Sequence, residues 1–280
     1  MTVFKRHPLV VFFVLAYLFS WLIWGTTIAQ NRGLLSFHIP SALVFWIGLN
    51  LATYITAALS GGWAAVKDVL SRIVRWRFNP VWYLVALLVT AAMSVAAIAL
   101  HRALGGSHQI GVLMTADKIL PSLLFQIFFF TLTEETAWRG FALPRLQAKY
   151  SALTSSLILG VLWGLWHLPL TLIPGTFQAT TPFAGFVLST IATTILMTWL
   201  FNHSRGSVLL AGIFHAATDV AIPYSNVMTG DLRLFWIFIA IQWGAAIAIV
   251  VSEGAAYLSR QKNLKEVSYP AGNLEAAIQA

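Results

Sequence analysis

The stretch ILPSLLFQIFFFTLTEETAWRGFAL, residues 119–143, decides the fold and carries the most informative charges of the chain. Within this stretch, no charged residue precedes the two adjacent carboxylates, Glu134 and Glu135, and Arg139 follows them. A membrane-spanning helix needs roughly 20 apolar residues, so this stretch can span a bilayer only by taking the glutamate pair into it. Charges at that depth are costly and usually functional.

Helical geometry gives the two glutamates different roles. Glu135 and Arg139 are separated by four residues and share a helix face, which predicts an ion pair. Glu134 points about 100° away from that face, so we expect it to lack a local partner and to be free for chemistry. The same helix is expected to run over 119–142 and to end at Pro144, whose ring would break it.

The composition predicts an all-α fold, a polytopic membrane bundle of helices. Hydrophobic residues make up 59% of the chain and charged residues 9%, whereas soluble domains carry roughly 25% charged residues. The alternating ~10-residue strands of a membrane β-barrel are missing. The absence of cysteine excludes disulfides and thiolate ligands. We assign the net charge of +8 to cytoplasmic loops and not to nucleic-acid binding.

About eight transmembrane helices are expected at roughly 20 residues each. Their approximate ranges are 8–29, 38–60, 80–100, 119–142, 152–173, 182–201, 207–223 and 233–252. The first is longer than the apolar region of a signal peptide and lacks a clear cleavage site, so we interpret it as a retained span. With the N-terminus inside, 13 of the 17 Lys and Arg residues lie in cytoplasmic segments, which predicts that both termini are cytoplasmic.

Three regions follow from this organisation. Residues 1–118 are predicted to form N-terminal transmembrane helices, with an amphipathic basic helix over 61–80 that lies on an anionic membrane face. Residues 119–223 are predicted to form a catalytic core. Residues 224–280 are predicted to hold the last transmembrane helix and a polar, frayed tail after about Ser259.

Ionisable residues enter the apolar stretches at only a few further places. His167 lies in the fifth span, and His215 and Asp219 lie four residues apart in the seventh. Each such group raises the free energy of membrane insertion by ~2.5–3.5 kcal/mol at mid-bilayer. This cost favours a functional site over a polar cluster that only joins helices. The helical rise per residue places Glu134 and His215 at ~14–15 Å from the cytoplasmic ends of their spans. His167 lies deeper, at ~18–24 Å, unless its helix tilts or begins in the cytoplasm.

A glutamate and two histidines in one pocket suit the activation of water. The carboxylate can act as a general base, and the imidazoles can donate to a developing oxyanion. Alternatively, Glu134, His167 and His215 with a water molecule form a plausible Zn²⁺ set. The helical HExxH motif is absent, no partner that orients His167 is evident, and no Ser or Cys stands out as a nucleophile. The residues leave a metal site and metal-free hydrolysis both open.

Three motifs in order resemble the CPBP intramembrane proteases, also called the CAAX protease and bacteriocin-processing (Abi) family. They are EETAWR at 134–139, WGLWH at 163–167, and GSVLLAGIFHAATD, which ends at Asp219. The first resembles the family's EExxxR motif, the second an aromatic residue near a His, and the third a His followed four residues later by Asn or Asp. The resemblance covers approximately residues 119–223. A weaker resemblance lies just before the third span.

The resemblance implies an endopeptidase, whose eukaryotic members remove the last three residues of prenylated CAAX proteins. Glu134 would activate the water, and His167 and His215 would bind a metal or stabilise the oxyanion. Asp219 would complete the oxyanion pocket. If the peptidases of the family carry Asn at this position, the chain departs from them here, because an aspartate donates a hydrogen bond only when it is protonated. Asp219 would then favour a charged His215 or a bound metal.

The resemblance also implies that Glu135 and Arg139 brace the site. We therefore expect a multi-pass, CAAX-type intramembrane endopeptidase of the bacterial inner membrane, a metalloprotease that hydrolyses its substrate by glutamate-activated water, with a metal-free glutamate mechanism as the alternative. Its expected partners are the lipid bilayer and a membrane-bound or hydrophobic peptide substrate, prenylated or a leader peptide or bacteriocin. The alternative is a non-catalytic bacteriocin-immunity or scaffold protein on the same fold. A proton-coupled transporter is disfavoured, because no paired half-span repeats or broken-helix signals are visible.

Overall fold

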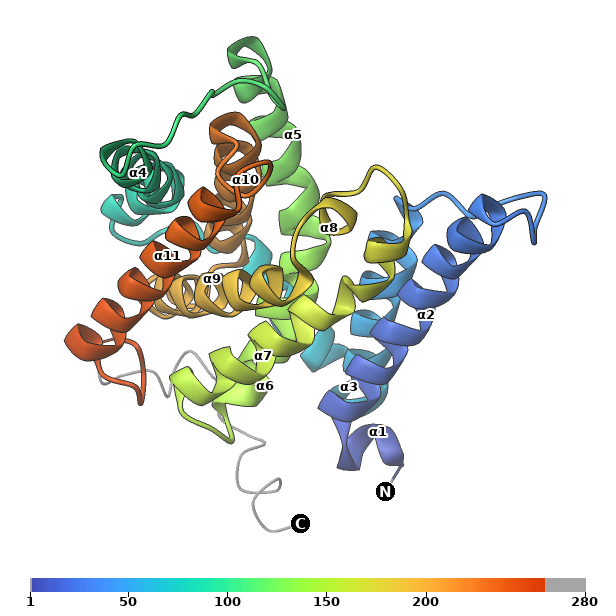
Figure 1. Cartoon of the computed structure of the whole chain (residues 1–280). Coiled ribbons are helices and arrows are strands. Elements are labelled where there is room, and N and C mark those ends of the chain that lie inside the picture. Colours follow the sequence, from blue (N-terminus) through green and yellow to red (C-terminus); the bar gives the residue numbers. More distant parts are fainter. Residues whose placement is uncertain (1, 260–280) are drawn as a thin grey trace.

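The computed structural model describes residues 2–259, and within that range it consists of helices and loops without any β-strand (Figure 1). The predicted polar tail after Ser259 lies outside the described residues. The elements, in chain order, are α1 (Val3–Arg6), α2 (Pro8–Asn31), η1 (Val44–Leu51), α3 (Ala52–Ile73), α4 (Val81–Ala103), η2 (Ala116–Lys118), α5 (Ile119–Leu132), η3 (Thr136–Ala142), α6 (Leu143–Gln147), α7 (Ala152–Trp166), η4 (Leu168–Leu172), α8 (Phe177–Thr180), α9 (Phe183–His203), α10 (Val208–Ser225) and α11 (Leu232–Glu253).

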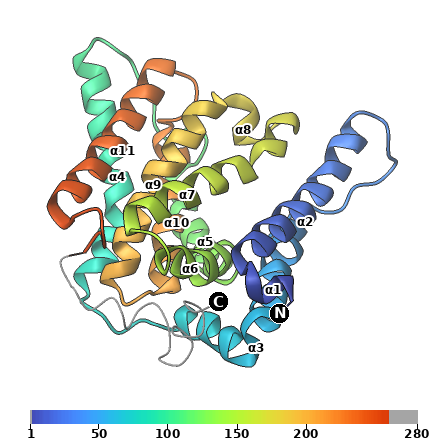
Figure 2. The same ribbon diagram turned by 90° about the horizontal axis from the view of Figure 1, so that it is seen from below.

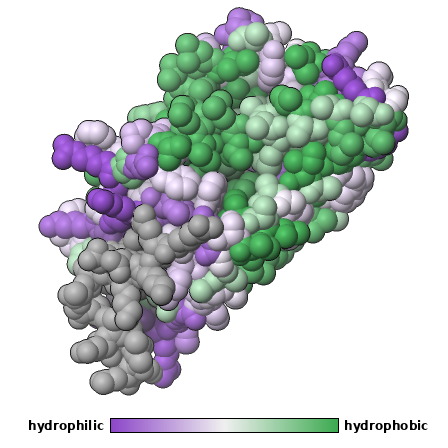
Figure 3. All heavy atoms as spheres, turned by 90° about the vertical axis from the view of Figure 1, so that its left-hand side faces the viewer, coloured by the Kyte–Doolittle hydropathy of each residue, from purple (hydrophilic) through white to green (hydrophobic). Residues whose placement is uncertain are grey.

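Eight helical segments of the described chain are long and apolar enough to cross a membrane, which confirms the all-α class and the expected number of spans. Their outer faces are apolar. On α2, for example, Val10, Val14, Leu18 and Leu22 recur every four residues and are all exposed. Figure 3 shows a broad hydrophobic surface on the side of α4 and α11, with hydrophilic residues toward the ends. A soluble monomer rarely exposes so much apolar surface. The side on which the termini lie stays a prediction.

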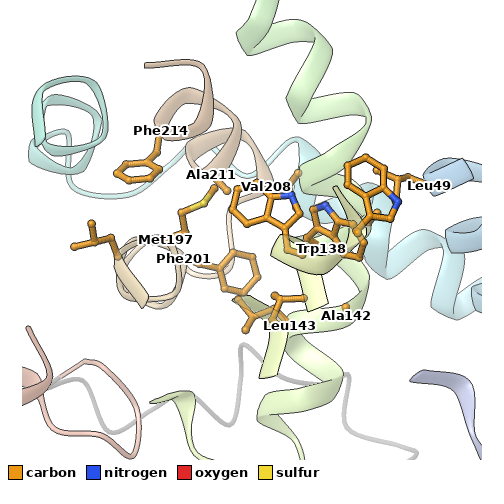
Figure 4. Close-up of a cluster of buried hydrophobic side chains, with 14 of the residues drawn as sticks. Leu49, Trp138, Ala142, Leu143, Met197, Phe201, Val208, Ala211 and Phe214 are labelled. Atoms are coloured by element: carbon orange, nitrogen blue, oxygen red, sulfur yellow. The ribbon is translucent and has the colours of Figure 1, made fainter. Parts of the chain in front are cut away.

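The helices pack as a bundle around α9 and α10 (Figures 1 and 2). The helix α10 contacts α4 and α5, and α9 contacts α7 and α11. Figure 4 shows the core where η3, α9 and α10 meet, with Trp138, Phe201 and Val208 packed together. Close approach of α10 to α5 depends on Gly212, since a Cβ there would lie 2.0 Å from Thr131 Oγ1. This contact brings the predicted residues of the seventh span against those of the fourth.

The fourth span is broken where a continuous helix was expected over 119–142. The helix α5 ends at Leu132, and Thr133 adopts φ −118° and ψ −93°, outside the helical region. The chain resumes as the π-helix η3. Pro144 does not end the span either, because it lies in the first turn of α6. A proline there has no helical N–H to lose, so the helix tolerates it.

The backbone groups that this break releases are satisfied by side chains. The hydroxyl of Thr136 donates to the carbonyl of Thr131 at 2.7 Å. The side-chain amide of Asn50 donates to the carbonyl of Leu132 at 2.9 Å. Irregular backbone at membrane depth is tolerated only where such partners exist. Asn50 comes from η1, so the second span stabilises the break that carries the glutamates.

Replacement of Asn50 by Leu is expected to lower the stability of the purified protein. The Leu132 carbonyl would lose its donor, and an unsatisfied buried carbonyl costs roughly 1–3 kcal/mol. Thermal unfolding in detergent measures the effect. Asn31→Leu, at an exposed position at the end of α2, is the control. Equal unfolding temperatures of Asn50→Leu and the wild type would contradict this role.

The segment predicted as an amphipathic helix over 61–80 is helical only as far as Ile73, the end of α3. Gly62 has φ +62°, a value that glycine reaches without strain, and the helix changes direction there. Beyond it, Val66 and Val69 are buried and Trp63 is exposed. The predicted amphipathic pattern is only partly present, because Leu70 and Val74 of its apolar face are exposed and Arg72 of its basic face is buried. Contact of the segment with an anionic membrane stays a prediction.

Candidate active site

A cavity of about 330 Å³ lies inside the bundle, and four residues from three spans line it: Glu134, His167, His215 and Asp219. Glu134 lies at the break after α5, His167 directly follows α7, and the other two are on α10. The structure therefore brings together all four of the predicted residues that were expected to face substrate. In Figure 1, α7 runs obliquely to α5, and a tilt of this kind is one of the two conditions under which the expected depth of His167 matches that of the other residues.

Behind the cavity lies a buried ionic network. Glu135 and Arg139 are both 0% exposed, and Arg139 Nη1 lies 3.0 Å from Glu135 Oε1, as the spacing predicts. The same oxygen lies 2.7 Å from His215 Nδ1. A carboxylate oxygen accepts from a ring N–H, so this contact places a hydrogen on Nδ1 and fixes the orientation of the His215 ring.

Glu134 has local partners, contrary to the expectation that it would be left alone. Its Oε2 accepts hydrogen bonds from the indole Nε1 of Trp163 at 2.8 Å and of Trp138 at 3.3 Å. The prediction was wrong because it considered only charged partners, although Trp138 lies four residues after Glu134. Within the described residues, no hydrogen bond reaches Oε1. That oxygen is available to a water molecule.

His167 is oriented by backbone rather than by a side chain. Its Nδ1 lies 2.8 Å from the carbonyl oxygen of Trp163. A carbonyl only accepts, so Nδ1 carries the hydrogen, and in the neutral ring Nε2 keeps a lone pair. No sequence pattern indicates this partner, because every residue has a carbonyl group.

The His215 ring is held on its face as well as at its edge. Phe130 stacks on it with ring centroids 3.8 Å apart and planes 2° from parallel. Its Nε2 lies 3.8 Å from Asp219 Oδ1, which is too long for a hydrogen bond but close enough for electrostatic attraction. The Asp219 side chain is 46% exposed, and it lines the cavity. His215 is thus placed between two carboxylates, one behind the cavity and one in it.

The predicted Zn²⁺ set has no direct support in this structure. Among the described residues, no group of three or more His, Asp or Glu side chains lies close enough to hold one ion. The atoms that a metal would need, Glu134 Oε1 and the Nε2 atoms of the two histidines, nonetheless have no hydrogen-bond partner there, and each Nδ1 contacts an oxygen that orients its ring. The Zn²⁺ set of Glu134, His167 and His215 therefore stays a prediction.

The remaining walls of the cavity are largely apolar and aromatic. They include Trp24, Phe45, Phe177 and Phe186. A cavity with such walls and a few convergent polar groups is the usual form of a site for a hydrophobic ligand. The arrangement can therefore hold an apolar group beside a carboxylate and two imidazoles.

Comparisons with known proteins agree with the motifs. Residues 116–221 match the family model described as type II CAAX prenyl endopeptidase Rce1-like. The chain is also 30% identical over 160 residues to CAAX prenyl protease 2 of Methanococcus maripaludis, a match over 53% of this chain and 59% of that protein. The chain thus spans less than two thirds of that relative's length. All six predicted site residues lie within the matched range.

Proposed function

We propose that the chain, whose residues 116–221 match the model of Rce1-like type II CAAX prenyl endopeptidases, is an intramembrane endopeptidase of the CPBP family. Its substrates would be membrane-bound or hydrophobic peptides, prenylated ones included. The observation that supports this most is the convergence of Glu134, His167 and His215 on one cavity with apolar walls. That cavity lies among helices of membrane-spanning length.

The reaction begins with Glu134 as general base. Its free Oε1 takes a proton from a water molecule, whose oxygen attacks the carbonyl carbon of the scissile peptide bond. In this proposal the lone pair on His167 Nε2 accepts the second hydrogen of this water and orients it. The carbonyl π-electrons move to oxygen and form a tetrahedral oxyanion.

His215 serves the developing oxyanion. To donate from Nε2 it must carry a proton there in addition to the one on Nδ1, and the Asp219 carboxylate, 3.8 Å away, stabilises that proton. In this proposal Asp219 acts through His215, which accounts for an aspartate where an asparagine would donate directly. Collapse of the intermediate then breaks the C–N bond, and the leaving nitrogen takes the proton held by Glu134.

A comparison of peptide C-termini tests the proposed function. Membranes of a host expressing the wild type or Glu134→Gln are compared by mass spectrometry for new peptide ends. Termini found only with the wild type would establish a peptidase and identify its substrate. Identical peptide sets would overturn the proposal and favour the non-catalytic immunity or scaffold protein.

Removal of metal is expected to leave cleavage unchanged, because the route proposed here activates water with the Glu134 carboxylate alone. The purified protein is dialysed against a strong chelator, its zinc content is measured by elemental analysis, and initial rates are compared before and after. A zinc protease with an HExxH motif, treated in the same buffer, shows that the chelator works. Loss of activity that added zinc restores would contradict the metal-free route.

A further inference from the structure

We propose that Trp163 is a positioning residue of the site, which binds one oxygen of Glu134 and thereby assigns the other as the base. This inference rests on the proposed function, since it concerns the same carboxylate. Sequence reasoning included Trp163 only as the aromatic residue of a motif and gave it no role.

The contact between the two side chains is short and buried. Trp163 Nε1 lies 2.8 Å from Glu134 Oε2, and the exposed fractions of the two residues are 6% and 3%. A hydrogen bond to a carboxylate is shorter and stronger than one between neutral groups. Trp138 adds a second indole donor to the same oxygen at 3.3 Å. With both donors on Oε2, the carboxylate plane is fixed and Oε1 is the oxygen left for water.

The same indole joins Glu134 to the ionic network behind the cavity. The guanidinium of Arg139 lies over the Trp163 ring, 4.3 Å from its centroid. The His215 ring meets Trp163 edge to face, with centroids 5.3 Å apart. Trp163 thus contacts the base and two members of the network that orients His215. It comes from α7, a different span from that of Glu134.

Substitution of Trp163 by Phe separates positioning from packing. Phe keeps an aromatic ring in the same place, and the backbone carbonyl that accepts from His167 is unchanged. What it removes is the N–H that Glu134 uses. A role in positioning therefore predicts a loss of kcat at nearly constant KM, whereas a role in packing predicts no such split.

The kinetic test uses a defined probe, an internally quenched farnesylated peptide that ends in a Cys-aliphatic-aliphatic-X sequence. For Trp163→Phe we expect kcat to fall roughly 10- to 100-fold, the range for a lost hydrogen bond to a charged group, with KM within about twofold. Trp199→Phe is the matched control, because the Trp199 indole N–H has no hydrogen-bond partner among the described residues and lies outside the cavity. It should behave as wild type. A folded Trp163→Phe protein with wild-type kcat would overturn the proposal.

A spectroscopic test does not depend on activity. Protein labelled with ¹⁵N at its tryptophan side chains is observed by NMR in detergent, and the Trp163 signal is identified by its loss in Trp163→Phe. In Glu134→Ala this signal should move upfield while that of Trp199 stays in place. An unmoved signal would show that the contact is absent. A wild type that leaves the probe and host peptides uncleaved, but shows the shift, would instead count against the proposed function.

Discussion

Replacement of Glu134 by Gln is expected to abolish detectable cleavage by the purified protein while leaving its fold intact. An amide cannot take a proton from water, and loss of a general base lowers kcat by roughly 10²- to 10⁴-fold. The fold should persist because Gln has the same shape, and its carbonyl oxygen can still accept from the indoles of Trp163 and Trp138. The substitution also removes a charge from a buried position, so it leaves no charge without a partner.

Initial cleavage rates and thermal unfolding, measured on the same detergent preparation, test the expected loss of activity and the expected intact fold. Asp117→Asn is the matched control, since it removes a carboxylate from an exposed position near the start of the same span. It should cleave as the wild type does. Undiminished cleavage by Glu134→Gln would remove Glu134 from the site. A large fall in unfolding temperature would instead show that the carboxylate is needed for structure.

The sequence predicted the spans and the ion pair well because both depend on local spacing. An apolar run of ~20 residues has few alternatives to a membrane helix. The i,i+4 relation of Glu135 and Arg139 places them on one face of the helix, and the structure shows the pair. The convergence of His167 and His215 on the glutamates was inferred from the cost of placing such groups in lipid.

The parts that the sequence could not predict depend on distant or neutral partners. The break at Thr133 is stable because Asn50, from another span, donates to the Leu132 carbonyl. The orientation of Glu134 depends on the indole of Trp163 from α7. In a membrane protein most tryptophans are interfacial anchors, and this chain has 12. The i,i+4 spacing to Glu134 distinguishes Trp138, but no local pattern distinguishes Trp163 from the other tryptophans.

Replacement of Arg139 by Met is expected to have the largest effect on stability. Glu135 would keep a negative charge at 0% exposure and lose its permanent cation, with only the His215 ring left as a partner. Removal of one partner of a buried ion pair typically costs about 3–5 kcal/mol, because the remaining charge is desolvated and uncompensated. We expect a much lower unfolding temperature and poor accumulation in membranes. Thermal unfolding of the purified protein, with the wild type in parallel, measures the first effect.

The double substitution Glu135→Leu with Arg139→Met separates stability from catalysis. Two apolar side chains of similar volume leave neither member of this pair charged, so most of the lost stability should return. Cleavage should stay low, because His215 Nδ1 would lose the carboxylate that orients its ring. If the double variant is no more stable than Arg139→Met alone, the two charges do not depend on each other as the 3.0 Å contact implies. If it cleaves as the wild type does, His215 needs no carboxylate behind it, and the network serves the fold alone.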